Sequence, residues 1–362
     1  MGTSEQVIER CPLCGSDRAT TIHRLTADDA ASHFVRRAVE PERYDRIRAE
    51  ICAIWPGETA TVNRCDECGF GFASPFRAGS PLFYEVLLQD PSFTSDRYEF
   101  GLTLDVLKGA PDRSAVKILE VGAGDGAFTK KLISAGFNPG NIVCTEYSHA
   151  GAAAIRAVGV KCLMTDVTDL SAEGVCGLTA ICIFQVMEHM DRLDEVWGSL
   201  TKLIAPGGQL FVSVPNGRGI EFSETHNGEL DMPPNHIGRW DRASFERIGA
   251  RHDWRLIDHR IEPTRRRAIA RSLAGSRFFR ARQTPGTLTD RATRFSNRRI
   301  RRIASAPLFA AWVLRSIPAA IAADPAALGG SQWAHFEFLG QSSGQALQAR
   351  TLPPPLPGRR ES

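Results

Sequence analysis

A run of three glycines directly after a short apolar segment constrains this chain more than any other stretch. Val116–Val121 is apolar and β-favouring, as a buried parallel strand should be. Gly122, Gly124 and Gly126 then occupy every second position, and a helical pattern begins at Phe128. Glycine lets the backbone turn sharply and approach a ligand, and a helix N-terminus offers unpaired N–H groups. The stretch therefore predicts a strand, a ligand-binding turn and a helix.

Two classes of nucleotide ligand suit such a turn. The pattern Gly122-x-Gly124-x-x-Ala127 fits the fingerprint of dinucleotide-binding domains, which bind a pyrophosphate there. Glu120 argues against a dinucleotide, because its carboxylate would repel the pyrophosphate. The same charge would attract a ligand with a cationic amino-acid group, such as S-adenosylmethionine (SAM). We therefore favour SAM over NAD, and a glycine-rich turn without a ligand is the plain alternative.

Length and composition suit a cytoplasmic protein with one large or two smaller domains. The chain has 362 residues, and an apolar content of 43% is enough for a substantial core. A net charge of +3 is too small to indicate a nucleic-acid partner by itself. We expect neither a signal peptide nor a membrane-spanning helix, because no uninterrupted apolar run of about 18 residues occurs. Nine cysteines, four of them in Cys-x-x-Cys pairs, fit a reducing compartment.

Two Cys-x-x-Cys-Gly motifs predict a structural zinc site. Cys11 and Cys14 form the first pair, and Cys65 and Cys68 form the second. Two residues between thiolates let both sulfurs reach one ion, and four thiolates close a tetrahedral site with no open position. A redox motif would not need the second pair, and a reducing compartment disfavours disulfides. Residues 1–75 are therefore expected to form a small zinc-binding domain, with a helical insert between the motifs.

Strand and helix signals alternate after the glycine turn, as a doubly wound α/β sheet requires. Residues 141–146 are predicted to form the second strand, and it ends in Glu146. A carboxylate at that position can accept hydrogen bonds from both hydroxyls of a ribose. Asp166 follows the third strand and is either a ligand-binding acid or the cap of a turn. Residues 178–184 are predicted to form the buried fourth strand.

The motifs further along resemble those of class I SAM-dependent methyltransferases. Glu-x-Gly-x-Gly-x-Gly begins at Glu120, Glu188-His189 follows the fourth strand, and Pro206-Gly-Gly and Val214-Pro-Asn flank the fifth. In this combination the chain is similar to a subgroup that includes ubiquinone-pathway O-methyltransferases and methyltransferases of sugar and natural-product pathways. Members with an N-terminal Cys-x-x-Cys-Gly pair, including deoxysugar C-methyltransferases, share its organisation. The resemblance covers roughly residues 11–261 and a final strand at 332–339.

The resemblance implies a fold, a cofactor and a set of cofactor-binding residues. The fold is a Rossmann-like, mostly parallel seven-stranded sheet within residues 113–345, and the cofactor is SAM. The acid after the third strand would bind the adenine amino group, and the N–H of Val167 would meet the ring. The SAM-binding residues implied are Glu120, Gly122, Ala123, Gly124, Gly126, Glu146, Tyr147, Asp166, Val167 and Gln185.

Two histidines and a glutamate are the candidates for catalysis. Methyl transfer from a sulfonium depends mostly on positioning, and a base matters when the acceptor is a hydroxyl or an acidic carbon. His189 lies just past the carboxyl end of a strand, where ligands bind in open α/β sheets. His236 lies in a loop that resembles the family's histidine-containing loop. His189 could equally be a helix-start residue bonded to the backbone, and Glu188 with His189 could hold a divalent metal.

Three segments lie outside the expected catalytic core. Residues 76–112 form an aromatic-rich connector that is either packing or a lid, with Tyr84 and Tyr98 as candidate ligand contacts. Residues 264–328 form a basic and then apolar insert between the last two strands. The insert suits an anionic membrane surface, a phosphate-bearing substrate, or a basic face whose apolar side packs on the catalytic domain. The tail, residues 346–362, is expected to be disordered.

Four functions compete, and a methyltransferase acting on a small molecule or sugar is favoured. The main alternative is an RNA methyltransferase that holds phosphates with the zinc domain and the arginines of the insert. The chain lacks the Cys-x-x-x-His pattern of rRNA guanine methyltransferases, and aromatic residues do not interleave with its basic run. Glu120 disfavours an NAD-dependent oxidoreductase, and the intact glycine motif disfavours a non-catalytic binding protein. The sequence names neither the acceptor atom nor the oligomeric state.

Overall fold

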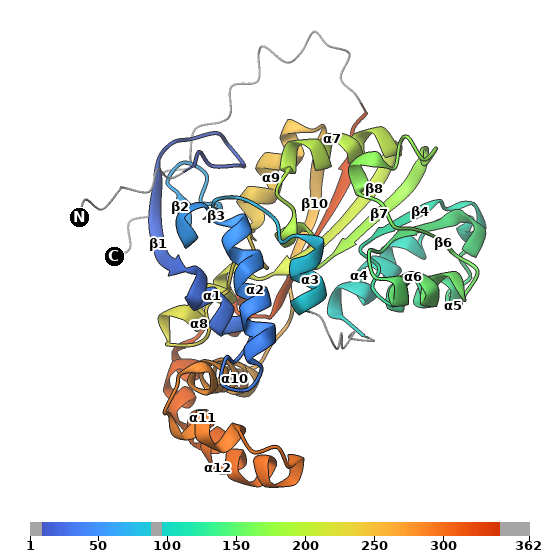
Figure 1. Ribbon diagram of the computed structural model, residues 1–362. Coiled ribbons are helices and arrows are strands. Elements are labelled where there is room, and N and C mark those ends of the chain that lie inside the picture. Colours follow the sequence, from blue (N-terminus) through green and yellow to red (C-terminus); the bar gives the residue numbers. More distant parts are fainter. Residues whose placement is uncertain (1–8, 88–95, 341–362) are drawn as a thin grey trace.

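A seven-stranded sheet is the framework of the molecule (Figure 1), whose computed structural model describes residues 9–87 and 96–340. The strand order is β10-β11-β8-β7-β4-β5-β6, and only β11 runs antiparallel to its neighbours. The predicted doubly wound, mostly parallel α/β fold is therefore confirmed. The strands are β4 (Ile118–Val121), β5 (Ile142–Thr145), β6 (Lys161–Leu163), β7 (Leu178–Phe184), β8 (Ile204–Pro215), β10 (Trp254–Ile261) and β11 (Ser331–Phe338).

Helices cover both faces of this sheet and bury one hydrophobic core on each side. One core joins the sheet to Phe100, Phe128 and Ile155, and the other joins it to Trp197 and Phe245. Side chains alternate along a strand, so the central strands are apolar toward both cores, as expected for parallel strands. The helices around the sheet are α4 (Tyr98–Leu107), α5 (Ala127–Ser134), α6 (His149–Arg156), α7 (Leu193–Leu203) and α9 (Arg242–Arg251).

Two strands differ from their predicted extents. Strand β8 begins at Ile204, which pairs with Leu178, so the Pro206-Gly-Gly segment lies within the strand and not before it. The register shifts between Leu178 and Ala180, which accommodates the extra residues as an irregularity. Strand β6 ends at Leu163, because Asp166 already caps a 3₁₀ turn after it.

A second, smaller sheet contains the N-terminal segment and one strand from far downstream. Its order is β1-β2-β3-β9, with all pairs antiparallel. The strands are β1 (Ala19–Thr26), β2 (Thr59–Cys65), β3 (Gly71–Ser74) and β9 (Gly238–Arg239). The expected helical insert forms α1 (Ala27–Phe34) and α2 (Pro41–Ile54), which bury Tyr44, Ile47 and Ile51. Because β9 belongs to the loop that carries His236, this sheet extends to the candidate active site.

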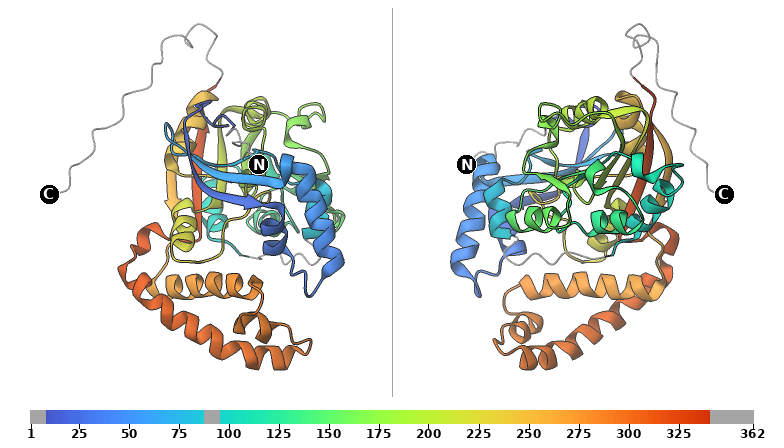
Figure 2. Two further views of the ribbon diagram at one scale, coloured as in Figure 1. Left: turned by 60° about the vertical axis from the view of Figure 1, so that its left-hand side comes forward. Right: turned by 90° about the vertical axis from the view of Figure 1, so that its right-hand side faces the viewer.

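The basic insert forms a separate layer of three helices below the sheet (Figure 2). Helix α10 (Arg266–Gln283) packs against the body of the protein, α11 (Leu288–Thr293) connects, and α12 (Arg298–Ala322) lies outermost. The insert contacts the N-terminal segment through an ion pair of 2.6 Å between Arg36 and Asp290. Helices α3 (Pro81–Leu87) and α8 (Gly217–Thr225) complete the elements near the candidate site.

Within the described residues, α12 is the one helix whose length and composition would let it cross a membrane. We expected no such helix from the sequence, because no uninterrupted apolar run of about 18 residues occurs; Arg315 and Pro318 interrupt this one. The helix nevertheless continues through both positions and through Pro307. Only 11% of its most apolar window is buried, so α12 is not a core helix of the protein. The predicted disorder of residues 346–362 lies outside the described residues.

Candidate active site

The glycine turn connects β4 to α5 at the carboxyl edge of the sheet. Gly122, Gly124 and Gly126 have φ angles of 67°, 58° and 77°, in the left-handed region that glycine adopts without strain. A Cβ atom on Gly122 would lie 2.6 Å from a methyl carbon of Val186. Ala123 donates its N–H to the carbonyl of Thr145 at 2.9 Å. The turn therefore needs glycine both for its conformation and for the space beside it.

Glu146, which directly follows β5, is hydrogen-bonded to the glycine turn. Its Oε2 accepts from the N–H of Gly124 at 2.9 Å, and its Oε1 accepts from the N–H of Ser148 at 2.8 Å. A Cβ atom on Gly151 would lie only 2.4 Å from the carbonyl oxygen of Gly124, so helix α6 also packs closely on the turn. A carboxylate has about four lone-pair sites. Glu146 can therefore hold the turn and still accept hydrogen bonds from a ligand.

Glu120 lies beneath the turn and is 3% exposed. Its Oε2 accepts a hydrogen bond of 2.5 Å from the hydroxyl of Thr129 on α5. Burial raises the pKa of Glu120 to about 7, although the Thr129 hydrogen bond acts in the opposite direction. A cationic group bound above the turn would favour the ionised carboxylate.

Asp166 is a turn cap, and its ligand-binding role stays a prediction. Its Oδ1 accepts from the N–H of Thr168 at 2.9 Å and thereby caps the 3₁₀ turn Val167–Asp169. Its Oδ2 lies 3.3 Å from both the hydroxyl of Tyr147 and the guanidinium of Arg192. Val167 is buried, whereas Tyr147 is exposed. One oxygen is used by the cap, and the other faces an open polar surface.

Gln185 and Glu99 meet at the same edge of the sheet. Gln185 follows β7 with a φ of 57°, an unusual conformation for a residue with a side chain, and its N–H bonds to the carbonyl of Ser213. Its side-chain amide lies 3.5 Å from a carboxylate oxygen of Glu99, which also accepts from the hydroxyl of Ser213 at 3.0 Å. Glu99 is 2% exposed and was not singled out from the sequence. Its only signal is an acid between two aromatic residues, Tyr98 and Phe100.

The two candidate histidines come together from separate parts of the chain. Glu188 and His189 belong to a 3₁₀ turn directly after β7, and His236 belongs to the loop before β9. The N–H of Ile237 donates to the carbonyl of Glu188 at 2.9 Å, which holds the loop against the turn. The two imidazole centroids are 4.9 Å apart. The hydroxyl of Tyr84, a candidate from the connector, lies 3.2 Å from Nδ1 of His189.

His189 is a buried imidazole that is bonded to the backbone through Nδ1. Its Nδ1 lies 2.5 Å from the carbonyl oxygen of Asn235, an acceptor, which assigns the hydrogen to Nδ1 and leaves Nε2 without one. Burial lowers the pKa of His189 to about 3, and the charge of His236 acts in the same direction. The bond to the backbone, which was the alternative to base catalysis, is present. A pKa this low makes His189 a weaker base than a free histidine, so its role as a proton acceptor stays a prediction.

His236 differs from His189 because a carboxylate faces it. Its Nδ1 lies 2.5 Å from Oδ1 of Asp231. Burial alone would lower the pKa of His236, but the charge and hydrogen bond of Asp231 raise it to about 9. His236 is therefore protonated at neutral pH while His189 is not. Asp231 was missed by sequence reasoning, and its only signal is an acid five positions before a loop histidine.

Glu188 supplies a third polar group to this cluster. The residue is 1% exposed, and its Oε2 has no hydrogen-bond partner among the described residues. Burial raises the pKa of Glu188 to about 7, against the opposing charge of His236. The donor atoms of Glu188, His189 and His236 all lie within 4.8 Å of one another. The cluster can therefore exchange protons with a ligand, and its geometry would also admit one divalent cation.

A cavity of about 520 Å³ opens beside His236. Its walls come from the loop with Asp231, from α8, from the apolar face of α10 with Ile269 and Leu273, and from His33 of α1. Burial raises the pKa of Glu229 in the wall to about 7. A cavity of this volume suits a small-molecule ligand. The catalytic sheet, the N-terminal segment and the insert all contribute to it.

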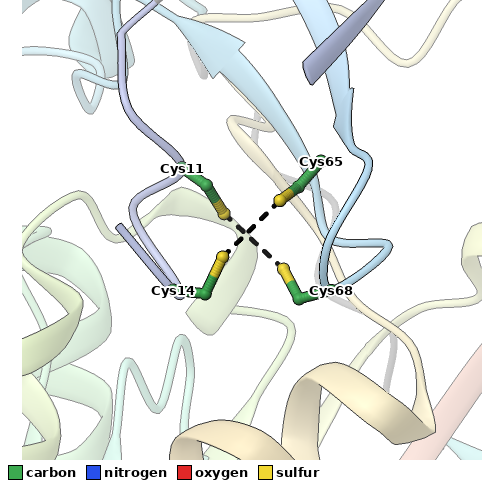
Figure 3. A group of neighbouring side chains, drawn as sticks. All are labelled: Cys11, Cys14, Cys65 and Cys68. Carbon is green, nitrogen blue, oxygen red and sulfur yellow. Dashed lines mark hydrogen bonds between the residues drawn. The ribbon is translucent and has the colours of Figure 1, made fainter. Parts of the chain in front are cut away.

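The four predicted metal ligands form one cluster away from this edge (Figure 3). All four sulfurs lie within 4.8 Å of one another, and the cysteines are free of disulfides. Cys11 and Cys68 are 3.6 Å apart, and Cys14 and Cys65 are 3.5 Å apart, measured between sulfurs. Zinc–thiolate bonds of about 2.3 Å in a tetrahedral site separate the sulfurs by about 3.8 Å. The observed spacing fits such a site.

Comparison with known proteins identifies the central part of the chain. Residues 95–259 match the family model described as a methyltransferase domain. This part of the chain is therefore similar to methyltransferase domains. The match includes the glycine turn and the two candidate histidines, and it leaves out the four cysteines and the basic insert. No curated protein gives a significant match.

Several solved structures resemble the chain at low similarity. A SAM-dependent methyltransferase from Archaeoglobus fulgidus has 11% identity and a TM-score of 0.44, over 70% of this chain and 99% of that chain. A putative sarcosine dimethylglycine methyltransferase from Galdieria sulphuraria has 12% identity and a TM-score of 0.40, over 71% and 88%. Coclaurine N-methyltransferase bound to N-methylheliamine and SAH has 12% identity and a TM-score of 0.41, over 68% and 75%. Similarity at this level assigns no activity to the chain.

Replacing Asp231 with asparagine should lower the pKa of His236 from about 9, because burial then acts without the carboxylate that outweighs it. NMR titration of the imidazole signals measures both values. In the wild type, the raised pKa stabilises the fold fully below a pH of about 6.5, and this contribution is lost as the pH rises through about 9. Asp45→Asn, at an exposed position of α2, is the control. A wild-type midpoint near 6.5 would contradict the assignment.

Proposed function

We propose that the protein is a cytoplasmic SAM-dependent methyltransferase acting on a small-molecule or sugar acceptor. The observation that carries the proposal is the hydrogen bond between Glu146 and Gly124, which places a carboxylate at a glycine turn within the methyltransferase domain. The turn provides close backbone approach, and the carboxylate provides acceptors for the hydroxyls of a ribose.

The charges around the turn favour a cation over a pyrophosphate. Glu120 lies beneath the turn, Glu146 is bonded to it, and Asp166, paired with Arg192, follows the neighbouring strand β6. A dinucleotide would place two phosphate charges among these acids, whereas SAM places an ammonium and a sulfonium there. In this assignment Glu146 binds the ribose, Asp166 and Val167 bind the adenine, and Glu120 supports the turn from below.

The acceptor is proposed to bind in the cavity beside His236 and to approach the methyl group along the line of the carbon–sulfur bond. SAM would supply an already activated methyl group. Nε2 of His189 would take the proton that the acceptor releases as it receives the methyl group. His236, which is positively charged, stabilises the negative charge that develops on the acceptor. Most of the rate enhancement would then come from positioning the acceptor atom against the methyl group.

We also propose that the four-cysteine cluster holds one structural zinc ion. Four thiolates leave no open position for a substrate, so the ion would stabilise the fold and take no part in methyl transfer. The cluster packs on the body of the protein, because the backbone carbonyl of Leu13 accepts from Arg251 of α9 at 2.7 Å. Metal binding would therefore stabilise the contact between the N-terminal segment and the methyltransferase domain.

Glu146→Ala should weaken SAM binding by about 1–3 kcal/mol, the cost of losing hydrogen bonds from ligand hydroxyls to an ionised group. Isothermal calorimetry measures the affinity, and thermal melting shows whether the variant is folded. Glu173→Ala, at an exposed position remote from the turn in sequence, is the matched control. Tight binding of NAD together with no binding of SAM would overturn the proposed function.

His189→Asn should abolish methyl transfer by about 10²–10⁴-fold while leaving the affinity for SAM unchanged, because the change removes the base and not the cofactor site. Asparagine can still donate to the carbonyl of Asn235. The assay incubates the protein with deuterium-labelled SAM and a cellular extract, and mass spectrometry locates the label. Label in RNA instead of the small-molecule fraction would favour the RNA alternative. Equal transfer by the variant would exclude His189 as the base.

Metal analysis of the purified protein should find one zinc ion per chain, and Cys65→Ser should lose the metal and lower the melting temperature. The physical reason is that three thiolates and a hydroxyl bind zinc far more weakly than four thiolates. Cys176→Ser, at an exposed cysteine outside the cluster, is the control and should change neither quantity. Full metal content and an unchanged melting temperature in Cys65→Ser would show that the assignment is wrong.

A further inference from the structure

The outermost helix, α12, presents an apolar stripe to the outside. Ile300, Ile303, Leu314, Ile317 and Ile321 have exposed fractions of 49%, 75%, 67%, 39% and 63%. Their spacing, with Pro307 and Ala310 between them, follows the three-to-four-residue repeat of one helix face over about 32 Å. These residues therefore form one continuous surface, here called the outer stripe.

The opposite face of α12 is already covered by α10. Ser316 and Ala320 are buried there, and the rings of Phe278 and Phe309 are 5.8 Å apart. Arg277 of α10 donates to the carbonyl of Arg315 and to the hydroxyl of Ser316, both at 3.1 Å. Packing within the protein thus accounts for the inner face and leaves the outer stripe unexplained. A basic face with its apolar side packed inward, one of the expectations from the sequence, does not describe this helix.

Positive charge surrounds the outer stripe and is almost unopposed. The insert, residues 264–328, contains fourteen arginines and two acids, Asp290 and Asp324. Asp290 is already shared by Arg36 and Arg294, at 2.6 and 2.7 Å. In the described part of the chain, no other ion pair involves an arginine of the insert. Four of these arginines are exposed at the start of α12, beside Ile300 and Ile303; they are Arg298, Arg299, Arg301 and Arg302.

A surface with these two properties fits the interface of an anionic membrane. The apolar stripe would lie at the boundary between headgroups and acyl chains, and the arginines would contact the anionic headgroups. A second copy of the chain would bring two arginine-rich surfaces together, and RNA would leave the apolar stripe exposed to water. A spanning orientation would draw Arg315 into the hydrocarbon and separate α12 from α10. We propose that the outer stripe of α12 binds flat on an anionic lipid surface.

The experiment is sedimentation of the full-length protein with phosphatidylcholine vesicles that contain or lack phosphatidylglycerol. We expect binding to the anionic vesicles at low salt, at least tenfold weaker binding to neutral vesicles, and loss of binding as salt is added. The proposal is overturned if binding depends on neither lipid charge nor salt concentration. It is also overturned if the protein does not bind anionic vesicles at low salt. Retention in the membrane after alkaline carbonate extraction also overturns it, because it indicates a spanning helix.

Two sets of substitutions separate the roles of the stripe and the charges. Changing Ile303, Leu314 and Ile321 to serine should weaken binding to anionic vesicles at least tenfold. Changing the four arginines at the start of α12 to glutamine should do the same and reduce the salt dependence. Ile257→Ser removes an apolar side chain of β10 that is 48% exposed, and it should leave binding unchanged.

Thermal melting and analytical ultracentrifugation complete the test. The substituted side chains are exposed, so the melting temperatures should match that of the wild type. If the serine variant converts a dimer to a monomer and keeps its vesicle binding, the outer stripe is a protein interface and the proposal fails. The proposal does not rest on methyl transfer, because vesicle binding is measured without SAM or an acceptor.

Discussion

One buried ion pair holds the N-terminal segment and the candidate active site in a single arrangement. Arg239 of β9 donates to both carboxylate oxygens of Glu224, at 2.9 and 2.6 Å, and the two side chains are only 11% and 4% exposed. The same carboxylate contacts His23 of β1 at 2.9 Å and accepts from the N–H of Asp231 at 3.0 Å. Loss of either partner would leave a buried charge uncompensated, at a cost of about 3–5 kcal/mol. The position of Asp231, and with it that of His236, depends on this pair.

Environment makes two neighbouring imidazoles chemically different. His189 faces a backbone carbonyl and His236 faces a carboxylate, so the pKa of the first is lowered to about 3 and that of the second is raised to about 9. One ring can therefore accept a proton while the other carries a positive charge at the same pH. The pKa values differ because Nδ1 of His189 faces the carbonyl of Asn235, whereas Nδ1 of His236 faces the carboxylate of Asp231. A small displacement of the loop would remove this difference in pKa.

Local patterns in the sequence were sufficient for the sheet and the glycine turn, because strand and helix periodicity and the need for glycine are read within a few residues. They were insufficient for Asp231 and Glu99, whose importance comes from burial and from partners on distant elements. The pairing of β9 with β3 could not be predicted from the sequence either, since a two-residue strand has no periodicity. For α12 the sequence showed that apolar and basic residues are concentrated together. It could not show that the inner face is covered and the outer one is not, because both faces are apolar.

The contribution of β9 to the N-terminal sheet bears on how such a protein can change during evolution. Gly71 pairs with Arg239, and a Cβ atom on Gly71 would lie 2.8 Å from the Cβ of Arg239, so the two strands fit only as a matched pair. A recombination event that exchanged the first 75 residues for those of another protein would lose this match. The four-cysteine segment and the histidine loop therefore have to change together, although residues 76–235 separate them in the chain.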